Sequence, residues 1–147
     1  MSATVFLLDV NVLVALAWPN HVHHVAAHEW FGTERDRRWA TCPLTESGFV
    51  RVSSNPATTP EARIPAEAIE LLERMVSQPG HVFWPDEVFL ATDRTIPRQR
   101  LLGHRQVTDA HLVRLTMQHG GRLATFDRGV RDLVPEDAPS DLVELLG

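Results

Sequence analysis

Short apolar runs of strand length alternate with segments of helical periodicity along this 147-residue chain. The runs are continuous and partly β-branched, which is typical of strands buried on both faces of a parallel sheet. Four runs are predicted to be strands: Val5–Leu8, Trp39–Thr41, Val82–Trp84 and Arg122–Phe126. Because helical segments separate these runs, the pattern predicts an α/β layer fold with a mostly parallel sheet.

The expected helices begin and end at residues that commonly mark helix boundaries. Pro43 suits a helix start, Pro19 ends a short helix, and Gly120 ends the last long one. The expected helices are a short one around Val12–Ala17, His21–Arg35, Pro43 to about Ser53, Pro65–Val76, one from about Asp86, and one capped by Thr108 that runs to about His119. A turn, a short helix and an apolar segment, Leu142–Leu146, finish the chain.

Apolar spacing also predicts which faces of two helices are buried. The expected inward residues are Val22, Val25, Ala26, Trp30 and Phe31 in the second helix, and Ala68, Ile69, Leu72 and Met75 in the fourth.

The composition fits one globular domain that spans residues 1–147. A hydrophobic content of 44% argues against disorder. The one cysteine, Cys42, cannot form an intramolecular disulfide. The N-terminal apolar stretch is interrupted by Asp9 and Asn11 and lacks a basic leader. We therefore expect a soluble cytoplasmic protein without a signal peptide or a membrane span.

All 14 basic residues are arginines, and the net charge is -5. The absence of lysine excludes Schiff-base catalysis and a lysine-dependent phosphate-binding loop. The net charge is not the average signature of a nucleic-acid binder. The net charge does not reveal that the arginines form local clusters. Such clusters are ordinarily explained as solvated faces. The clusters are Arg35, Arg37 and Arg38; Arg94, Arg98, Arg100 and Arg105; and Arg128 and Arg131.

Four acidic residues occupy positions where a fold of this kind places functional groups. Asp9 and Asp127 each follow an apolar run, and ligands of parallel sheets bind beyond the carboxyl ends of the strands. Asp109 opens a helical pattern, and Glu46 lies near the start of another. Converging carboxylates cannot all stay ionised without a cation, and Mg²⁺ and Mn²⁺ prefer such oxygen ligands.

Each acid also has an ordinary explanation. Asp9 suits an N-cap, Asp127 a turn, and Asp109 the dipole of a first helical turn, whereas Glu46 could face solvent. Asn11 could cap its own helix or orient a carboxylate or a metal-bound water. Standard βα geometry would nevertheless allow all four acids to reach one edge of the sheet.

The ordered set of motifs resembles PIN-domain ribonucleases, most closely the VapC toxins of type II toxin–antitoxin systems. The resemblance covers essentially the whole chain. It rests on Leu8-Asp9-Val10-Asn11, Thr45-Glu46 after Pro43, Thr108-Asp109-Ala110 and Ala124-Thr125-Phe126-Asp127. It implies a three-layer α/β/α PIN-like fold with a short, mostly parallel central sheet.

In that family an acidic quartet binds divalent metal, here Mg²⁺ or Mn²⁺. The matching residues are Asp9, Glu46, Asp109 and Asp127, which are thus implied as metal ligands and catalytic residues, with Asn11 and Thr125 at supporting polar positions. The implied reaction is hydrolysis of RNA phosphodiester bonds that leaves a 5′-phosphate and a 3′-hydroxyl. An RNA strand also needs positive charge and stacking groups, for which Arg51, His104 and Arg105 are the candidates.

The resemblance also implies partners. A small VapB-like antitoxin would cover apolar surface with its tail, and Trp18, Trp30 and Phe31 are candidate contacts if they do not pack in the core. A homodimer is expected, whereas membrane association and specific DNA binding by this chain alone are not.

Three other interpretations remain. A haloacid-dehalogenase-type phosphatase also uses an aspartate after an apolar strand, but Asn11 replaces its second acid and its lysine is missing. A non-catalytic RNA- or protein-binding module would gain nothing from clustered carboxylates that repel phosphates. His24 and His28 could share a helix face as zinc ligands, although no cysteine completes a zinc pattern.

Overall fold

Five parallel strands form one sheet in the order β3-β2-β1-β4-β5 in the computed structural model, which describes residues 4–34 and 36–147. The strands are β1 (Val5–Leu8), β2 (Arg38–Thr41), β3 (His81–Phe83), β4 (Arg122–Thr125) and β5 (Val143–Leu145). β1 lies in the middle, where Phe6 pairs with Trp39 of β2 and with Arg122 of β4. The predicted α/β class and parallel sheet are therefore confirmed.

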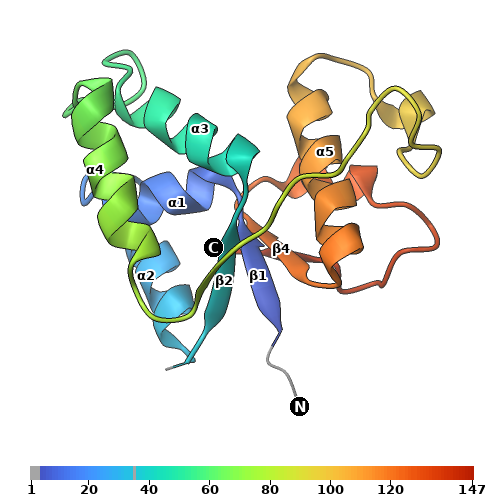
Figure 1. Ribbon diagram of the computed structural model, residues 1–147, viewed down its shortest axis with the longest axis horizontal. Coiled ribbons are helices and arrows are strands. Elements are labelled where there is room, and N and C mark those ends of the chain that lie inside the picture. The colour runs from blue at the N-terminus through green and yellow to red at the C-terminus, as the bar shows by residue number, and fades with distance from the viewer. Residues whose placement is uncertain (1–3, 35) are drawn as a thin grey trace.

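Helices cover both faces of this sheet, as Figure 1 shows. One layer holds α1 (Val10–Ala17), α2 (His24–Gly32), α3 (Pro43–Ser53) and α4 (Pro65–Val76). The opposite layer holds α5 (Arg105–His119), which contacts the short 3-10 helix η2 (Arg128–Leu133). A second 3-10 turn, η1 (Arg98–Arg100), lies in the long connection before α5. The implied three-layer α/β/α architecture is therefore confirmed.

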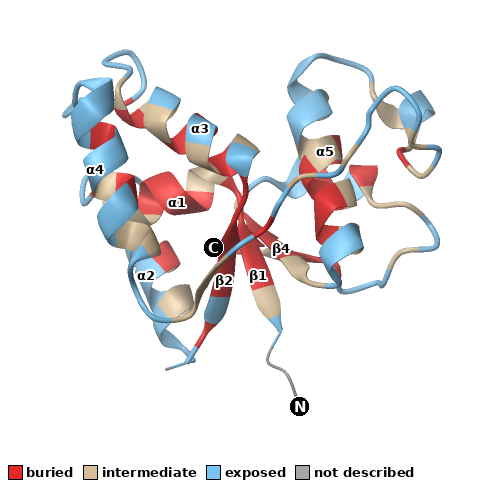
Figure 2. Cartoon of the chain, in the orientation of Figure 1, coloured by how far each residue is buried: buried red, intermediate tan, exposed pale blue. Residues whose placement is uncertain are grey.

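Two apolar cores lie on the two faces of the sheet. Side chains alternate along β1, so Phe6 and Leu8 pack with α1 and α3 on one face, while Leu7 packs with α5 on the other. Leu7 and Leu8 are fully buried, and Figure 2 shows burial concentrated in the central strands and the helix faces that meet them. Burial on both faces explains why the strand is a continuous apolar run.

The fifth strand was not assigned from the sequence. The apolar segment Leu142–Leu146 contains β5, which pairs with β4 through Leu123 and Val143. With only three residues in the strand, its periodicity is too short to identify, and its partner lies twenty residues earlier in the chain.

The second predicted helix is longer than the observed one. α2 begins at His24 and ends at Gly32, and the predicted end at Arg35 lies outside the described residues. Val22 and Val25 are exposed, so their predicted inward orientation is wrong, and Ala27 is the buried residue of the helix. Ile69 of α4 is also exposed, whereas Ala68 and Leu72 are buried as predicted.

The helix predicted from about Asp86 does not form. The Asp86 carboxylate instead accepts a hydrogen bond from Val88 N and contacts His111 Nε2 of α5 at 2.6 Å. Asp93 behaves similarly, accepting from Thr95 N and from Arg114 Nε of α5. These turn-forming carboxylates fix an irregular segment against α5, and their distant partners are not visible in local sequence.

The last long helix begins four residues before the predicted start. Thr108 is not its N-cap, because α5 starts at Arg105 after His104. The Gln106 side chain reaches back and accepts hydrogen bonds from the backbone N–H groups of Leu102 and Gly103. At the other end, Gly120 adopts a left-handed conformation with φ of 67°, as its predicted role in ending the helix requires.

No helix within the described residues is long and apolar enough to span a membrane.

Candidate active site

Asp9 lies directly beyond the carboxyl end of β1 and is 7% exposed. Its Oδ1 accepts a hydrogen bond from Val10 N at 2.7 Å, so the predicted N-cap role is confirmed. Its Oδ2 accepts a second hydrogen bond, also at 2.7 Å, from the hydroxyl of Thr125 at the end of β4. Burial raises the pKa of Asp9 and the charge of Asp127 adds to this, although both hydrogen bonds oppose the shift.

The buried Thr125 hydroxyl connects three parts of this edge of the sheet. It donates to Asp9 and accepts from Asn11 Nδ2 at 3.3 Å and from Asp127 N at 3.0 Å. One donor and two lone pairs are thus all used. Asn11 Oδ1 accepts from Phe126 N. Asn11 is not the cap of α1, because Asp9 holds that position, so its alternative interpretation as an N-cap is wrong.

Asp109 and Asp127 belong to the same electrostatic environment as Asp9. Asp127 is exposed and caps η2 by accepting a hydrogen bond from Gly129 N, so the predicted turn role is confirmed. Asp109 was predicted to lie in the first turn of its helix. That prediction is wrong, because α5 begins at Arg105 and Asp109 lies one turn further along. Burial, followed by the charges of Asp9 and Asp127, raises the pKa of Asp109 to about 7. The charges of Asp9 and Asp127 therefore reach Asp109.

Glu46 approaches the same edge of the sheet from the neighbouring strand. It lies in the first turn of α3, directly after β2, and its Oε2 accepts a hydrogen bond from the Thr41 hydroxyl at 2.6 Å. α3 packs closely on α1 because Gly48 has no side chain: a Cβ there would lie 2.6 Å from Val10 Cγ2. The carboxyl ends of parallel strands point to one edge, so Glu46 lies on the side of the sheet that carries Asp9.

The four acids do not close onto one point. Glu46 does not contribute to the pKa shift of Asp9 or Asp109, whereas Asp127 contributes to both. Across residues 4–34 and 36–147, no group of three His, Cys, Asp or Glu side chains is arranged to hold a metal ion. Asp9, Asp109 and Asp127 thus lie close enough for their charges to affect one another, whereas the charge of Glu46 affects neither Asp9 nor Asp109.

The candidate substrate-binding residues are all exposed. Arg51 lies in the last turn of α3 and lines, with Glu46, a shallow groove of about 660 Å³ between α3 and α4. His104 and Arg105 stand at the start of α5, the helix that carries Asp109.

The histidines proposed as a zinc alternative have structural partners. His24 Nδ1 lies 2.7 Å from Ala15 O, and His28 Nε2 lies 2.9 Å from Leu16 O. Both rings therefore contact carbonyl groups that the end of α1 leaves without helical partners.

Sequence reasoning missed Thr41 and His81. The Thr41 hydroxyl lies 2.8 Å from His81 Nε2 in β3, in addition to its bond to Glu46. Burial lowers the pKa of His81, and the charge of Glu46 partly opposes that shift. Thr41 could have been identified from the sequence, because it is the last residue of a predicted strand, and Asp9 and Asp127 were selected for their similar positions directly after strands.

The family model of the PIN domain matches residues 6–134. The chain is 49% identical over 140 residues to Ribonuclease VapC39 of Mycobacterium tuberculosis, covering 95% of this chain and 98% of that protein. It is 50% identical over 140 residues to Ribonuclease VapC38 of the same organism, covering 95% and 96%. It is also 44% identical over 124 residues to Ribonuclease VapC44, covering 84% and 87%. The chain therefore belongs to the PIN-domain family and, within it, to the VapC ribonucleases.

Proposed function

We propose that this protein is a divalent-metal-dependent endoribonuclease and the toxin of a type II toxin–antitoxin pair. One observation carries the proposal: Asp9, Asp109 and Asp127 come from separate parts of the chain and share one electrostatic environment beyond the sheet edge. Family membership supports the reaction class, because relatives about half identical over nearly the whole chain are ribonucleases by name.

The donor chemistry of the site fits Mg²⁺ or Mn²⁺. Both ions prefer carboxylate oxygens. Burial raises the pKa of Asp9 and of Asp109, neighbouring carboxylate charges add to both shifts, and a cation would favour the ionised form of each group. We infer that Asp9, Asp109 and Asp127 hold the ion and that Glu46 completes the set. A bound ion would supply an activated water and neutralise the scissile phosphate.

The remaining polar residues prepare the site for this task. Thr125 fixes Asp9 through the 2.7 Å hydrogen bond, and Asn11 keeps the Thr125 hydroxyl directed at that carboxylate. Arg51, His104 and Arg105 would contact the RNA strand, since arginine pairs with phosphate and histidine can stack on an unpaired base.

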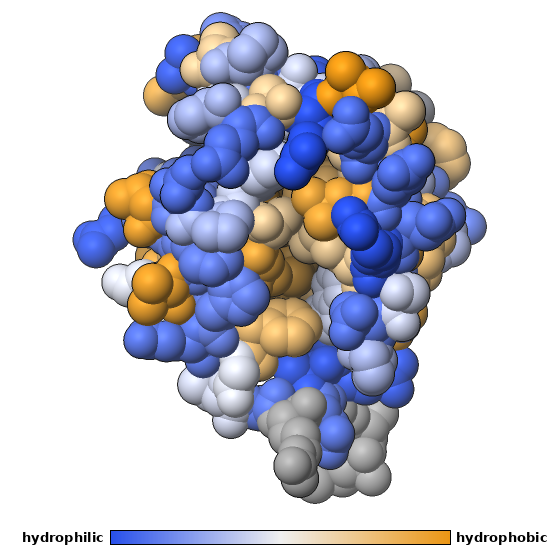
Figure 3. Space-filling model, turned by 90° about the vertical axis from the view of Figure 1, so that its left-hand side faces the viewer, coloured by the Kyte–Doolittle hydropathy of each residue, from blue (hydrophilic) through white to orange (hydrophobic). Residues whose placement is uncertain are grey.

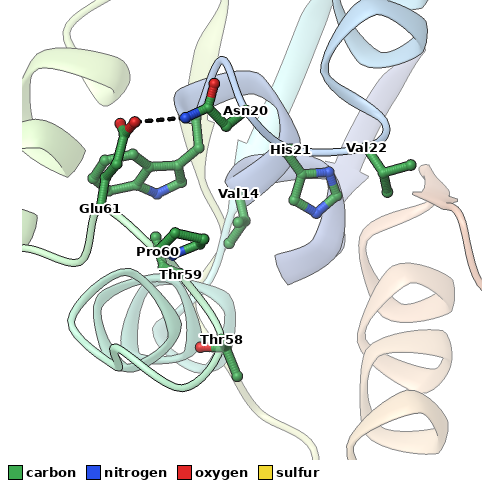
Figure 4. Close-up of a pocket in the computed structure, with 9 residues that line it drawn as sticks. Val14, Asn20, His21, Val22, Thr58, Thr59, Pro60 and Glu61 are labelled. Carbon is green, nitrogen blue, oxygen red and sulfur yellow. Dashed lines mark hydrogen bonds between the residues drawn. The ribbon is translucent and has the colours of Figure 1, made fainter.

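A VapB-like antitoxin is the proposed protein partner, and an apolar hollow near α1 offers it a docking place. Figure 3 shows apolar surface between hydrophilic ridges on this side of the molecule. A cavity of about 280 Å³ is lined by Val14, Trp18, Pro60 and Glu61, and Figure 4 shows the hydrogen bond between Asn20 and Glu61 at its rim.

Of the three candidate contacts, Trp18 lines this hollow but is itself buried and donates to Ser53 Oγ. Trp30 and Phe31 pack against the core, so core packing is their observed role. We further propose that the protein is a cytoplasmic homodimer that does not bind DNA specifically on its own.

The proposed reaction is tested by incubating purified protein with RNA in Mg²⁺, in Mn²⁺ or in EDTA, and by comparing wild type with Asp9→Asn. The wild type should cleave only with metal, and Asp9→Asn should lose at least roughly 100-fold of the rate, because asparagine keeps the cap but not the charge. Cleavage in EDTA, or equal cleavage by both proteins, would sink the proposal.

A further inference from the structure

Two consecutive hydrogen bonds link Glu46, through Thr41 of β2, to His81 of the neighbouring strand β3. Thr41 Oγ1 lies 2.6 Å from Glu46 Oε2 and 2.8 Å from His81 Nε2. Thr41 is fully buried, whereas Glu46 and His81 are partly exposed. Within the described residues, hydrogen bonds engage only one Glu46 oxygen, Oε2, and Oε1 stays available for a ligand.

The chemistry of the three groups gives this chain one direction. A threonine hydroxyl has one hydrogen and two lone pairs, and an ionised carboxylate can only accept. The Thr41 hydrogen therefore points to Glu46, so its lone pair must accept from His81. His81 must accordingly carry a hydrogen on Nε2. With that hydrogen in place, Thr41 cannot turn its own hydrogen toward the ring and away from Glu46.

The sheet and a neighbouring aromatic ring hold His81 in this position. In the parallel register of β2 and β3, Trp39 pairs with His81, and Thr41 lies two residues further on the same face. The His81 ring meets the buried Trp39 edge-on, with 4.7 Å between ring centroids. Both contacts are made by residues of the paired strands β2 and β3, so the sheet places the imidazole beside Thr41.

We propose that His81 is a positioning residue of the metal site, which acts through Thr41 to hold Glu46 with one oxygen directed for cation binding. The inference rests on the proposed function, because it gives Glu46 the role of a ligand. It explains how Glu46 acquires a defined orientation. Removing such partners of metal ligands typically weakens metal affinity 10- to 100-fold.

Calorimetric titration of Mn²⁺ into the intact protein tests the proposal with four variants. His81→Phe keeps the aromatic contact with Trp39 but removes the N–H, and should weaken Mn²⁺ binding roughly tenfold. His81→Gln can place an amide N–H near the position of Nε2 and should bind within about twofold of wild type. In a Glu46→Ala background, adding His81→Phe should change Mn²⁺ affinity no further.

Wild-type affinity in His81→Phe, equal weakening in His81→Gln, or an undiminished effect in the Glu46→Ala background would each overturn the role of His81. Two other results would instead contradict the proposed function: no Mn²⁺ binding by wild type, or Mn²⁺ binding by Glu46→Ala that equals that of wild type. Nitrogen NMR of the folded wild type adds a second measurement. It should find the Nε2–H form of His81, and the Nδ1–H form would also refute the inference.

Discussion

Replacing Asp109 by asparagine should stabilise the metal-free protein at alkaline pH. Burial and the charges of Asp9 and Asp127 raise the pKa of Asp109 from the ordinary 3.8 to about 7. A difference of that size corresponds to about 4 kcal/mol, because each pKa unit is worth about 1.4 kcal/mol. Asp109 is only half-buried, so solvent screening reduces the expected gain to about 1–2 kcal/mol.

The effect has a defined pH window. Between pH 3.8 and about 7 the unfolded chain has lost the Asp109 proton while the folded chain still binds it. The wild type therefore loses stability as pH rises through that window, and the full loss is present above pH 7. Asparagine does not ionise, so Asp109→Asn should be more stable to unfolding than wild type at pH 8 and equally stable at pH 3.5.

Urea denaturation in EDTA at pH 3.5, 6 and 8 measures the free energy of unfolding of both proteins. The exposed Asp137→Asn serves as the matched control and should follow wild type at each pH. A raised pKa of Asp109 is contradicted if Asp109→Asn is no more stable than wild type at pH 8, or if its advantage is the same at every pH.

Two further predictions concern contacts around the site. Thr125→Val leaves the buried Asp9 oxygen without its donor and should lower the free energy of unfolding by about 1–3 kcal/mol, whereas Thr125→Ser should retain most of it; equal denaturation midpoints would contradict this. Arg114→Ala removes the 2.7 Å contact with Asp93, so trypsin should cut at Arg94 faster, and an unchanged cleavage rate would argue that the segment is held elsewhere.

The layers of the fold were predictable because each strand carries its own signal. β1 is a continuous apolar run, and the alternation of strands and helices predicts a parallel sheet, although it does not specify that β1 pairs with β2 and β4. The positions of Asp9 and Asp127 after strands were equally local, so their approach to one edge could be expected from sequence.

The elements that sequence misassigned depend on contacts between distant residues. Asp86 looks like a helix start, yet its carboxylate binds His111 twenty-five residues later and holds the segment irregular. Val22 and Val25 have helical spacing, but Val22 lies in the turn before α2 and Val25 lies in its first turn, and both are exposed. Such outcomes are set by tertiary packing rather than by local periodicity.

In the candidate site too, the acids could be predicted from local sequence, whereas their contacts with distant residues could not. Glu46 could be singled out by its place near a helix start, but its bond to Thr41 and the further contact with His81 require β2 and β3 to pair. The charge of Asp9 affects the pKa of Asp109 only because α5 lies near the edge of the sheet at which β1 ends. The sequence does not specify where α5 packs.

Mn²⁺ binding by the folded protein tests the central claim most directly. Calorimetry should detect binding to wild type and to Asp137→Asn with equal affinity, while Asp9→Asn and Asp109→Asn should each weaken it by at least roughly tenfold. Mn²⁺ binding of equal strength in all four proteins would contradict a joint role of these carboxylates as the metal site of a ribonuclease.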